Sequence, residues 1–269
     1  MKKLTLYLLA IAAALAVALP LALMLMNSLK SGAEVQQGFL ALPREPGLAA
    51  WRQAWALLSG SFGTSLLVAV PAVLLSAGLA ALNGFVLCKY RFRGERWVGL
   101  LLVLAFFLPI KVYLLPLAIT MARLGLERSL GLLVAIHVIY SLPLALFFRN
   151  HFLAFPDELL QAARLDGAGF WRLLWRVVLP LSRPIFVVVL ILQFTTVWNE
   201  YLFGLVFGPE DARPITAALA QLGAQTETGA RAYPLEMAAA LLAAAPTLGV
   251  YLLAGRHFTR GLVAGAVKG

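Results

Sequence analysis

The sequence has little charge for its length. Of its 269 residues only 13% are charged and 62% are hydrophobic, whereas a soluble globular domain carries about 25% charged residues. The apolar residues recur along the whole chain instead of gathering at one end. This composition excludes an ordinary soluble enzyme and predicts an all-α protein that crosses a membrane several times.

The sequence also lacks the residues that most catalytic and metal sites need. Its single cysteine, Cys88, excludes an internal disulfide, and no Cys/His cluster has the spacing of metal ligands. No G-x-x-x-x-G-K-S/T phosphate loop occurs, so we expect this chain to bind no cofactor and to hydrolyse no ATP. The histidines His137, His151 and His257 lie on separate segments, and Ser61 fits a turn or cap. We therefore expect no catalytic residues and no metal site.

Six apolar stretches are long enough to cross a bilayer, whose hydrocarbon core of about 30 Å needs roughly 20 helical residues. They are residues 4–26, 62–87, 97–121, 130–148, 184–207 and 233–254. The first stretch follows Lys2 and Lys3 as a secretory signal would, but its apolar run exceeds a signal core of about 7–15 residues, which predicts a retained span. Prolines that kink or interrupt helices sit in or near these stretches. They are Pro71, Pro109, Pro116, Pro143 and Pro246.

The basic residues are distributed unequally between the two sides of these spans. The net charge is +10, and fourteen basic residues fall on one side against seven on the other. The richer side holds Lys2, Lys3, Lys89, Arg91, Arg93, Arg96, Arg149, Arg164, Arg172, Arg176, Arg183, Arg256, Arg260 and Lys268. This bias predicts that both chain ends and the connection 149–183 are cytoplasmic. Because orientation accounts for the excess charge, nucleic-acid binding loses its support.

Two connections carry helical patterns of their own. Trp51, Trp55 and Leu58 recur at helical spacing, which predicts a short interfacial helix over 49–58, either a cap on the bundle or a docking element. In the connection 149–183, Pro156-Asp157-Glu158 is a helix-start signal, and we expect a helix over 158–165 that ends near Gly167 and Gly169.

A second helix is expected to follow these glycines and to carry one apolar face. Trp171, Leu174, Trp175 and Val178 fall at i, i+3, i+4 and i+7, and Leu179-Pro180 ends the pattern. The residues alone fit two interpretations equally, an interfacial helix pair on anionic lipid or a docking surface for a soluble partner. A simple connector would need far fewer ordered residues.

A few polar residues lie inside the predicted spans, where ionisable groups usually face a cavity or a partner. Gln193 and Glu200 are seven residues apart and are expected to share one face of the fifth span, with Asn199 turned about 100° away. With Lys111 and Trp198 they are the candidates for lining a translocation pathway. The alternatives are a lysine that extends to the interface and a polar clasp between helices.

Three separated elements in the connection 149–183 resemble the EAA motif of binding-protein-dependent ABC importer permeases. They are Gln161-Ala162-Ala163, Asp166-Gly167-Ala168 and Leu179-Pro180, at the family's spacing before the fifth span. Trp198-Asn199-Glu200 and the final Gly261-Leu262 through Gly269 are similar to carbohydrate-uptake permeases of the maltose-permease type. The resemblance covers residues 62–269, with residues 1–61 forming a first span and a periplasmic loop. Gln161 replaces the usual glutamate and lacks its charge.

The resemblance implies a role and a set of partners. The chain would be a multi-pass permease subunit of a bacterial or archaeal cytoplasmic membrane, importing a sugar or related polyol together with a second, similar permease. Residues 149–183 would be the coupling loop, seated on one of two cytoplasmic ATPase subunits that hold ATP and Mg²⁺. A periplasmic or lipid-anchored binding protein would deliver the solute. The alternative is an ion-coupled secondary transporter, which predicts paired intramembrane carboxylates and internal symmetry.

Overall fold

A computed structural model describes residues 2–226 and 233–266, and within these residues every regular element is helical. Contacts divide the chain into two compact units. Unit 1 comprises Met1–Gly63 and Ile215–Pro246, and unit 2 comprises Thr64–Pro214 and Thr247–Gly269. Two long helices, α3 (Ala49–Lys89) and α14 (Tyr233–Ala266), belong partly to each unit.

Unit 1 holds α1 (Lys2–Ser28), α2 (Gly32–Gln37), the start of α3, α13 (Ile215–Thr226) and the start of α14. The connection after α1 is built around Lys30, which is only 5% exposed. Its ammonium donates to Asn27 Oδ1 at 2.9 Å and to the carbonyls of Gly38 and Phe39 at 2.9 and 3.2 Å. A buried cation needs such acceptors, so this connection has a defined structure.

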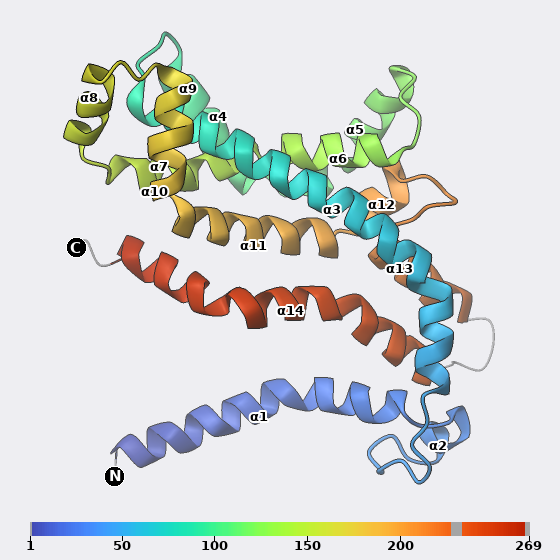
Figure 1. Cartoon of the computed structure of the whole chain (residues 1–269). Coiled ribbons are helices and arrows are strands. Elements are labelled where there is room, and N and C mark those ends of the chain that lie inside the picture. Colours follow the sequence, from blue (N-terminus) through green and yellow to red (C-terminus); the bar gives the residue numbers. More distant parts are fainter. Residues whose placement is uncertain (1, 227–232, 267–269) are drawn as a thin grey trace. The chain divides into compact units, whose positions relative to one another are not determined.

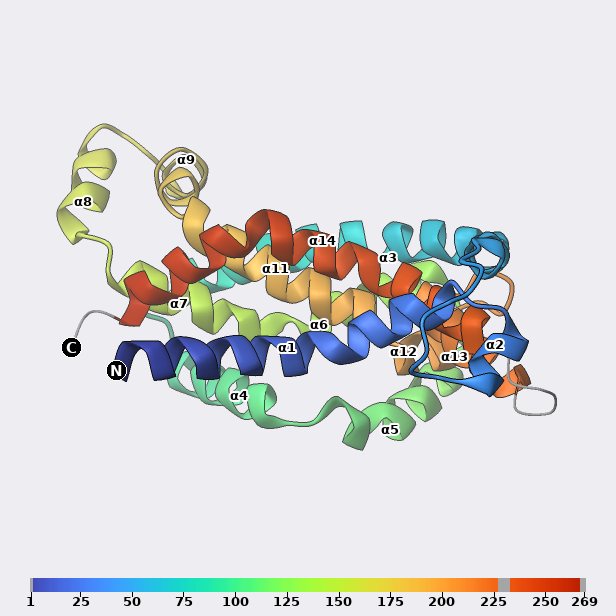
Figure 2. The ribbon, with the colours of Figure 1, turned by 90° about the horizontal axis from the view of Figure 1, so that it is seen from below.

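Unit 2 contains the remaining helices, shown in Figures 1 and 2. In chain order they are the rest of α3, α4 (Glu95–Phe107), α5 (Ile110–Arg123), α6 (Leu130–Tyr140), η1 (Leu142–Leu144), α7 (Ala145–Leu153), α8 (Asp157–Leu165), α9 (Phe170–Leu173), η2 (Leu174–Val178), α10 (Leu179–Leu181), α11 (Arg183–Asn199) and α12 (Leu202–Phe207). In both views α8 and α9 lie at the end of the unit opposite to α5 and α12.

The described residues contain four helices long and apolar enough to cross a membrane, and two bent helix pairs that qualify together. The predicted spans 4–26 and 233–254 fall within α1 and α14. The stretch 97–121, expected as one helix, is α4 and α5 bent by 109° at Leu108-Pro109. Proline has no N–H to continue the helix, which explains the break.

Two further boundaries differ from the prediction. The expected separate helix over 49–58 is wrong, because these residues are the first turns of the unbroken 41-residue α3. The expected span 184–207 is also wrong as one helix, because α11 ends at Asn199 and Glu200 adopts an extended backbone before α12.

The core of unit 2 depends on a close approach between α3 and α7. Gly84 faces α7 so closely that a Cβ there would lie 2.6 Å from Phe148 Cβ and 2.7 Å from the carbonyl oxygen of Ala145. Small residues at such crossings let helix backbones pack tightly. This contact holds the end of α3 beside the helix that leads into the segment 149–183.

Candidate functional site: the helical segment 149–183

The segment 149–183 is fastened to the end of α3 by charged contacts. Lys89 pairs with Asp157 at the start of α8, with Nζ 2.7 Å from Oδ1, and also donates to the carbonyl of Phe155 at 3.4 Å. Bonding to the Lys89 ammonium lowers the pKa of Asp157 below its usual value of 3.8. In the last turn of α8, the guanidinium of Arg164 lies 5.8 Å from the ring centroid of Tyr90. Both contacts join positions more than 60 residues apart, and no local pattern in the sequence predicts them.

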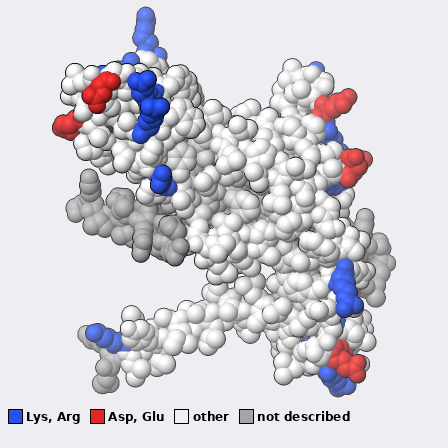
Figure 3. Space-filling model, viewed as in Figure 1, with Lys and Arg blue, Asp and Glu red and all other residues white. Residues whose placement is uncertain are grey.

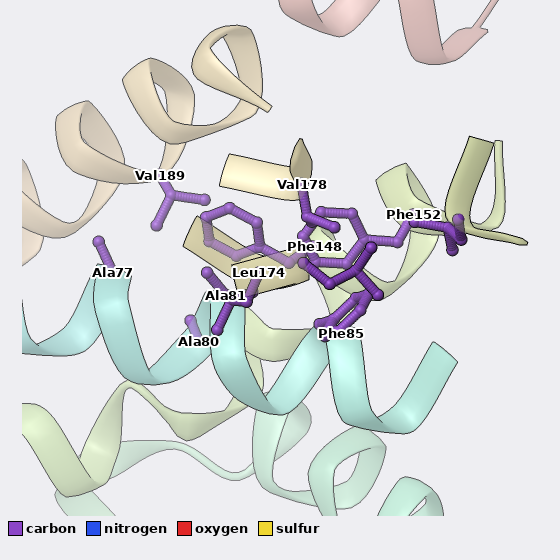
Figure 4. Close-up of a cluster of buried hydrophobic side chains, with 11 residues drawn as sticks. Ala77, Ala80, Ala81, Phe85, Phe148, Phe152, Leu174, Val178 and Val189 are labelled. Carbon is purple, nitrogen blue, oxygen red and sulfur yellow. The ribbon is translucent and has the colours of Figure 1, made fainter. Parts of the chain in front are cut away.

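The inward side of α8 packs into a hydrophobic cluster that six elements share. Leu160 is the buried residue of α8, at 4% exposure. Around it lie residues of α3, α7, α9, η2 and α11 (Figure 4). The buried members are Ala77, Ala80, Ala81, Phe85, Phe148, Phe152, Leu160, Leu173, Leu174, Val178 and Val189. Phe85 of α3 contacts the rings of Phe152 and Phe170, and Leu160 joins α8 to the same cluster, so α8, α9 and the end of α3 form one packed body.

The turn after α8 explains the pattern Ala163-x-x-Asp166-Gly167-Ala168. The Ala168 N–H donates to the carbonyl of Ala163, and the Gly167 N–H donates to that of Arg164, both at 3.0 Å. These two bonds define a Schellman motif, whose residue after the cap takes a left-handed conformation. Gly167 has φ +78°, a conformation that glycine adopts without steric cost. The glycine therefore fixes the direction in which the chain leaves α8.

The other side of α8 faces outward and is partly apolar. Gln161, Ala162 and Asp166 are exposed, and Leu165 is 89% exposed. Figure 3 shows acidic side chains over α8 and basic side chains over α9. The helix therefore has one face fixed in the core by Leu160 and one open face that carries Gln161, Ala162 and Leu165. The sequence predicted the helix but not which of its residues face outward.

The second helix of the segment differs from the prediction. Trp171, Leu174, Trp175 and Val178 were expected on one apolar face, but only Leu174 and Val178 are buried, at 3% and 1% exposure. Trp171 and Trp175 are 60% and 64% exposed. The inward face is instead made by Leu173 and Leu174 and, four residues later, by Val177 and Val178, and the two tryptophans lie on the exposed side between them.

The end of this second helix also lies later than expected. Leu179 and Pro180 are the first residues of α10, so the helix continues to Leu181 and does not stop at the proline. The direction changes at buried Ser182, whose hydroxyl donates to the carbonyl of Val178 at 2.6 Å. There the pair α9–α10 and α11 is bent by 81°.

The candidate pathway residues occupy different environments. Gln193 is 5% exposed and donates to Ser76 Oγ at 3.2 Å and to the carbonyl of His137 at 3.5 Å, so it ties α11 to α3 and α6. Trp198 is 1% exposed and stacks on Phe194, with ring centroids 5.4 Å apart. For Gln193 the structure shows the polar clasp between helices.

Glu200 lies where the fifth span breaks. Its carboxylate accepts hydrogen bonds from the N–H groups of Leu202 at 3.0 Å and Phe203 at 2.6 Å. These bonds supply partners for backbone N–H groups at the start of α12 that have none within the helix. The predicted common face with Gln193 is therefore wrong, because the helical periodicity ends at Asn199. Asn199 and Lys111 are exposed. Within the described residues, no group of three His, Cys, Asp or Glu side chains is placed to hold a metal ion.

A family model described as the binding-protein-dependent transport system inner membrane component matches residues 75–262. The chain belongs to this family. The match includes the whole segment 149–183 together with α11, α12 and most of α14. The chain is thus a multi-pass protein of the cytoplasmic membrane and a permease of the ABC transporter type, not a catalytic subunit.

Relatives and solved structures agree with this assignment. The permease is 40% identical over 190 residues to a probable ABC transporter permease protein of Pyrococcus horikoshii, covering 69% of this chain and 68% of that protein. It is 32% identical over 263 residues to a xylose/arabinose import permease protein of Haloferax volcanii, covering 88% and 84%. A crystal structure of a bacterial ABC transporter involved in alginate import contains a chain of the same fold, with TM-score 0.78, 22% identity and 96% coverage of both chains.

Proposed function

We propose that this permease forms, with a second homologous permease, the membrane pathway of an ABC importer for a sugar or related polyol. The printed names of relatives support this substrate class, since they include xylose/arabinose and melibiose/raffinose/stachyose import permeases. Two cytoplasmic ATPase subunits bind ATP and Mg²⁺ and drive transport. A periplasmic or lipid-anchored binding protein delivers the solute, and a related alginate importer has been solved in complex with such a periplasmic protein.

The topology proposed for the chain has six spans. This number follows if α4 and α5 together count as one span and α11 counts as another, beside the four continuous helices. The excess of basic residues then places both ends and the segment 149–183 in the cytoplasm.

The segment 149–183 is proposed as the coupling loop that docks on an ATPase subunit. One observation carries this role: α8 presents the 89% exposed Leu165 beside Gln161 and Ala162, while Leu160 on its other face is buried. A helix held in this way moves with the membrane helices behind it. Movement of the ATPase subunits would reach α3 through Lys89–Asp157 and α11 through the hydrophobic cluster, as a rigid-body displacement.

The remaining motif residues have supporting roles in this proposal. Gly167 sets the turn, Ala163 and Ala168 supply its bonded backbone groups, and Leu179 and Pro180 lead into the bend before α11. In the pathway, exposed Lys111 and Asn199 contact solute together with Glu200 at the break. Gln193 and Trp198 act behind them by holding α11 in place.

Co-expression with candidate ATPase and partner permease subunits, followed by reconstitution in proteoliposomes, tests this function. We expect sugar-loaded binding protein to stimulate ATP hydrolysis, and Leu165→Glu to abolish the stimulation by placing a charge at the docking surface. Leu124→Glu is the matched control, because Leu124 is 65% exposed and ends α5, at the opposite end of the unit.

Two results would contradict the proposal. If Leu165→Glu and Leu124→Glu behave alike, α8 is not the docking helix. If the chain neither assembles with an ATPase nor alters ATP hydrolysis, the importer function is wrong, and transport driven by an ion gradient becomes the explanation to test.

A further inference from the structure

An apolar groove runs between α3 and the helices that follow α8. It has a volume of about 440 Å³. Its walls include Leu75 and Gly78 of α3, Leu190 of α11, and the two exposed tryptophans Trp171 and Trp175. This groove is distinct from the exposed face of α8 that carries Leu165.

The tryptophans lie on the outward side of this helix, whose inward side carries the buried Leu173, Leu174 and Val178. Trp171 and Trp175 are 60% and 64% exposed and lie along the groove, in or next to the π-helical stretch η2. π-Helical turns are rare and occur frequently at functional sites. Exposed tryptophans next to membrane helices are typical of the zone where acyl chains meet headgroups.

Basic side chains accompany the tryptophans. Arg172 and Arg176 each follow one tryptophan in sequence, and both are exposed. The two salt bridges found in the described part of the chain, Lys89–Asp157 and Arg128–Glu210, involve neither arginine. Both arginines lie on the same helix as the tryptophans that line the groove, so basic side chains lie near its apolar walls.

We propose that this groove binds an anionic phospholipid, with an acyl chain against α3 and α11 and the headgroup phosphate at Arg172 and Arg176. Three features together favour a lipid as the occupant: an apolar groove, tryptophans typical of the membrane interface, and two exposed arginines beside a membrane helix. Basic pockets of this kind between membrane helices select anionic headgroups. A bound lipid also buttresses η2, the segment that joins α9 to the bend before α11.

Fluorescence quenching in lipid nanodiscs tests the proposal with the full chain. Phosphatidylglycerol or phosphatidylcholine with brominated acyl chains is added at the same mole fraction, and tryptophan emission is compared. The part of the tryptophan emission that is lost in the double variant Trp171→Phe/Trp175→Phe comes from the two tryptophans of the groove. We expect this part to be quenched more strongly by brominated phosphatidylglycerol, and the preference to weaken as salt is raised.

Charge variants connect this preference to the arginines. Each basic residue near an anionic surface contributes about fivefold in affinity. Arg172→Gln/Arg176→Gln is therefore expected to lower the preference for phosphatidylglycerol by roughly twentyfold. The matched control, Arg91→Gln/Arg93→Gln, removes two exposed arginines that lie outside the helix carrying Trp171 and Trp175, and it should leave the preference unchanged. Gly78→Leu fills the groove, since nothing lies within 4 Å of a Cβ there, and should reduce quenching by both lipids.

Two outcomes would overturn the proposal. Equal quenching by the two lipids would show that the arginines select no headgroup. Absence of quenching by either lipid would show that no acyl chain occupies the groove. Neither outcome depends on ATPase coupling, so this test stands apart from that of the importer function.

Discussion

Gly167 provides a sharp test of the turn that ends α8. Its φ of +78° is disfavoured for residues with a Cβ, although a Cβ there would meet nothing within 4 Å. The left-handed conformation costs a residue such as alanine about 1–2 kcal/mol. Gly167→Ala is therefore expected to favour opening of the turn by roughly 5- to 30-fold. Gly167→Asn should cost less, because asparagine tolerates this conformation.

The matched control is Gly169→Ala. Gly169 also has open space around it, but its φ of −70° and ψ of 172° are ordinary for any residue. Hydrogen exchange of the Asp166 and Ala168 amides, which donate to Ala162 and Ala163, reports the opening directly. We expect faster exchange in Gly167→Ala and unchanged exchange in Gly169→Ala. The reasoning is refuted if Gly167→Ala exchanges like the wild type or if both alanine variants change equally.

Three further predictions concern stability. Gly84→Ala should lower the thermal midpoint of unfolding in detergent, because overpacking against α7 costs about 1–3 kcal/mol. Gly78→Ala on the same helix should leave the midpoint unchanged. Equal midpoints for the two variants would contradict this prediction. The depressed pKa of Asp157 means that its contact with Lys89 is present at neutral pH and lost only as pH falls below 3.8. Asp157→Asn should thus speed amide hydrogen exchange in α8, and the ratio of the variant's rate to the wild-type rate should be constant between about pH 5 and 8. A ratio that changes across this range would exclude loss of the Lys89–Asp157 ion pair as the cause. Lys30→Met leaves the buried Oδ1 of Asn27 without its donor, which should lower the thermal midpoint through a loss of about 1–3 kcal/mol. A midpoint equal to that of the wild type would show that this oxygen finds another donor.

Hydropathy predicted the spans well where a helix is simply long and apolar, as in α1 and α14. The breaks were harder to predict because proline acts differently in different surroundings. Pro71 and Pro246 lie inside continuous helices, whereas Pro109 lies where α4 and α5 bend apart. A sequence shows where a hydrogen bond is missing but not whether neighbouring helices compensate for it.

The segment 149–183 was predictable in its local features and not in its packing. Pro156 and Gly167 marked the start and end of α8 because caps are properties of a few adjacent residues. The contact of Lys89 with Asp157 joins distant parts of the chain, so no pattern within one helix reveals it. The outward position of Trp171 and Trp175 was missed because a second apolar set, Leu173, Leu174, Val177 and Val178, also has helical spacing and is the one that packs inward.

The π-helical stretch η2 also has a consequence for how this segment tolerates sequence change. A π-turn holds about one residue more than an α-turn, and one residue corresponds to about 100° of helix rotation. Deleting one residue within 174–178 would leave an ordinary α-helix of nearly the same length and would keep the angular relation between the residues on either side. We therefore expect the chain to tolerate a one-residue deletion in η2 better than one in α11.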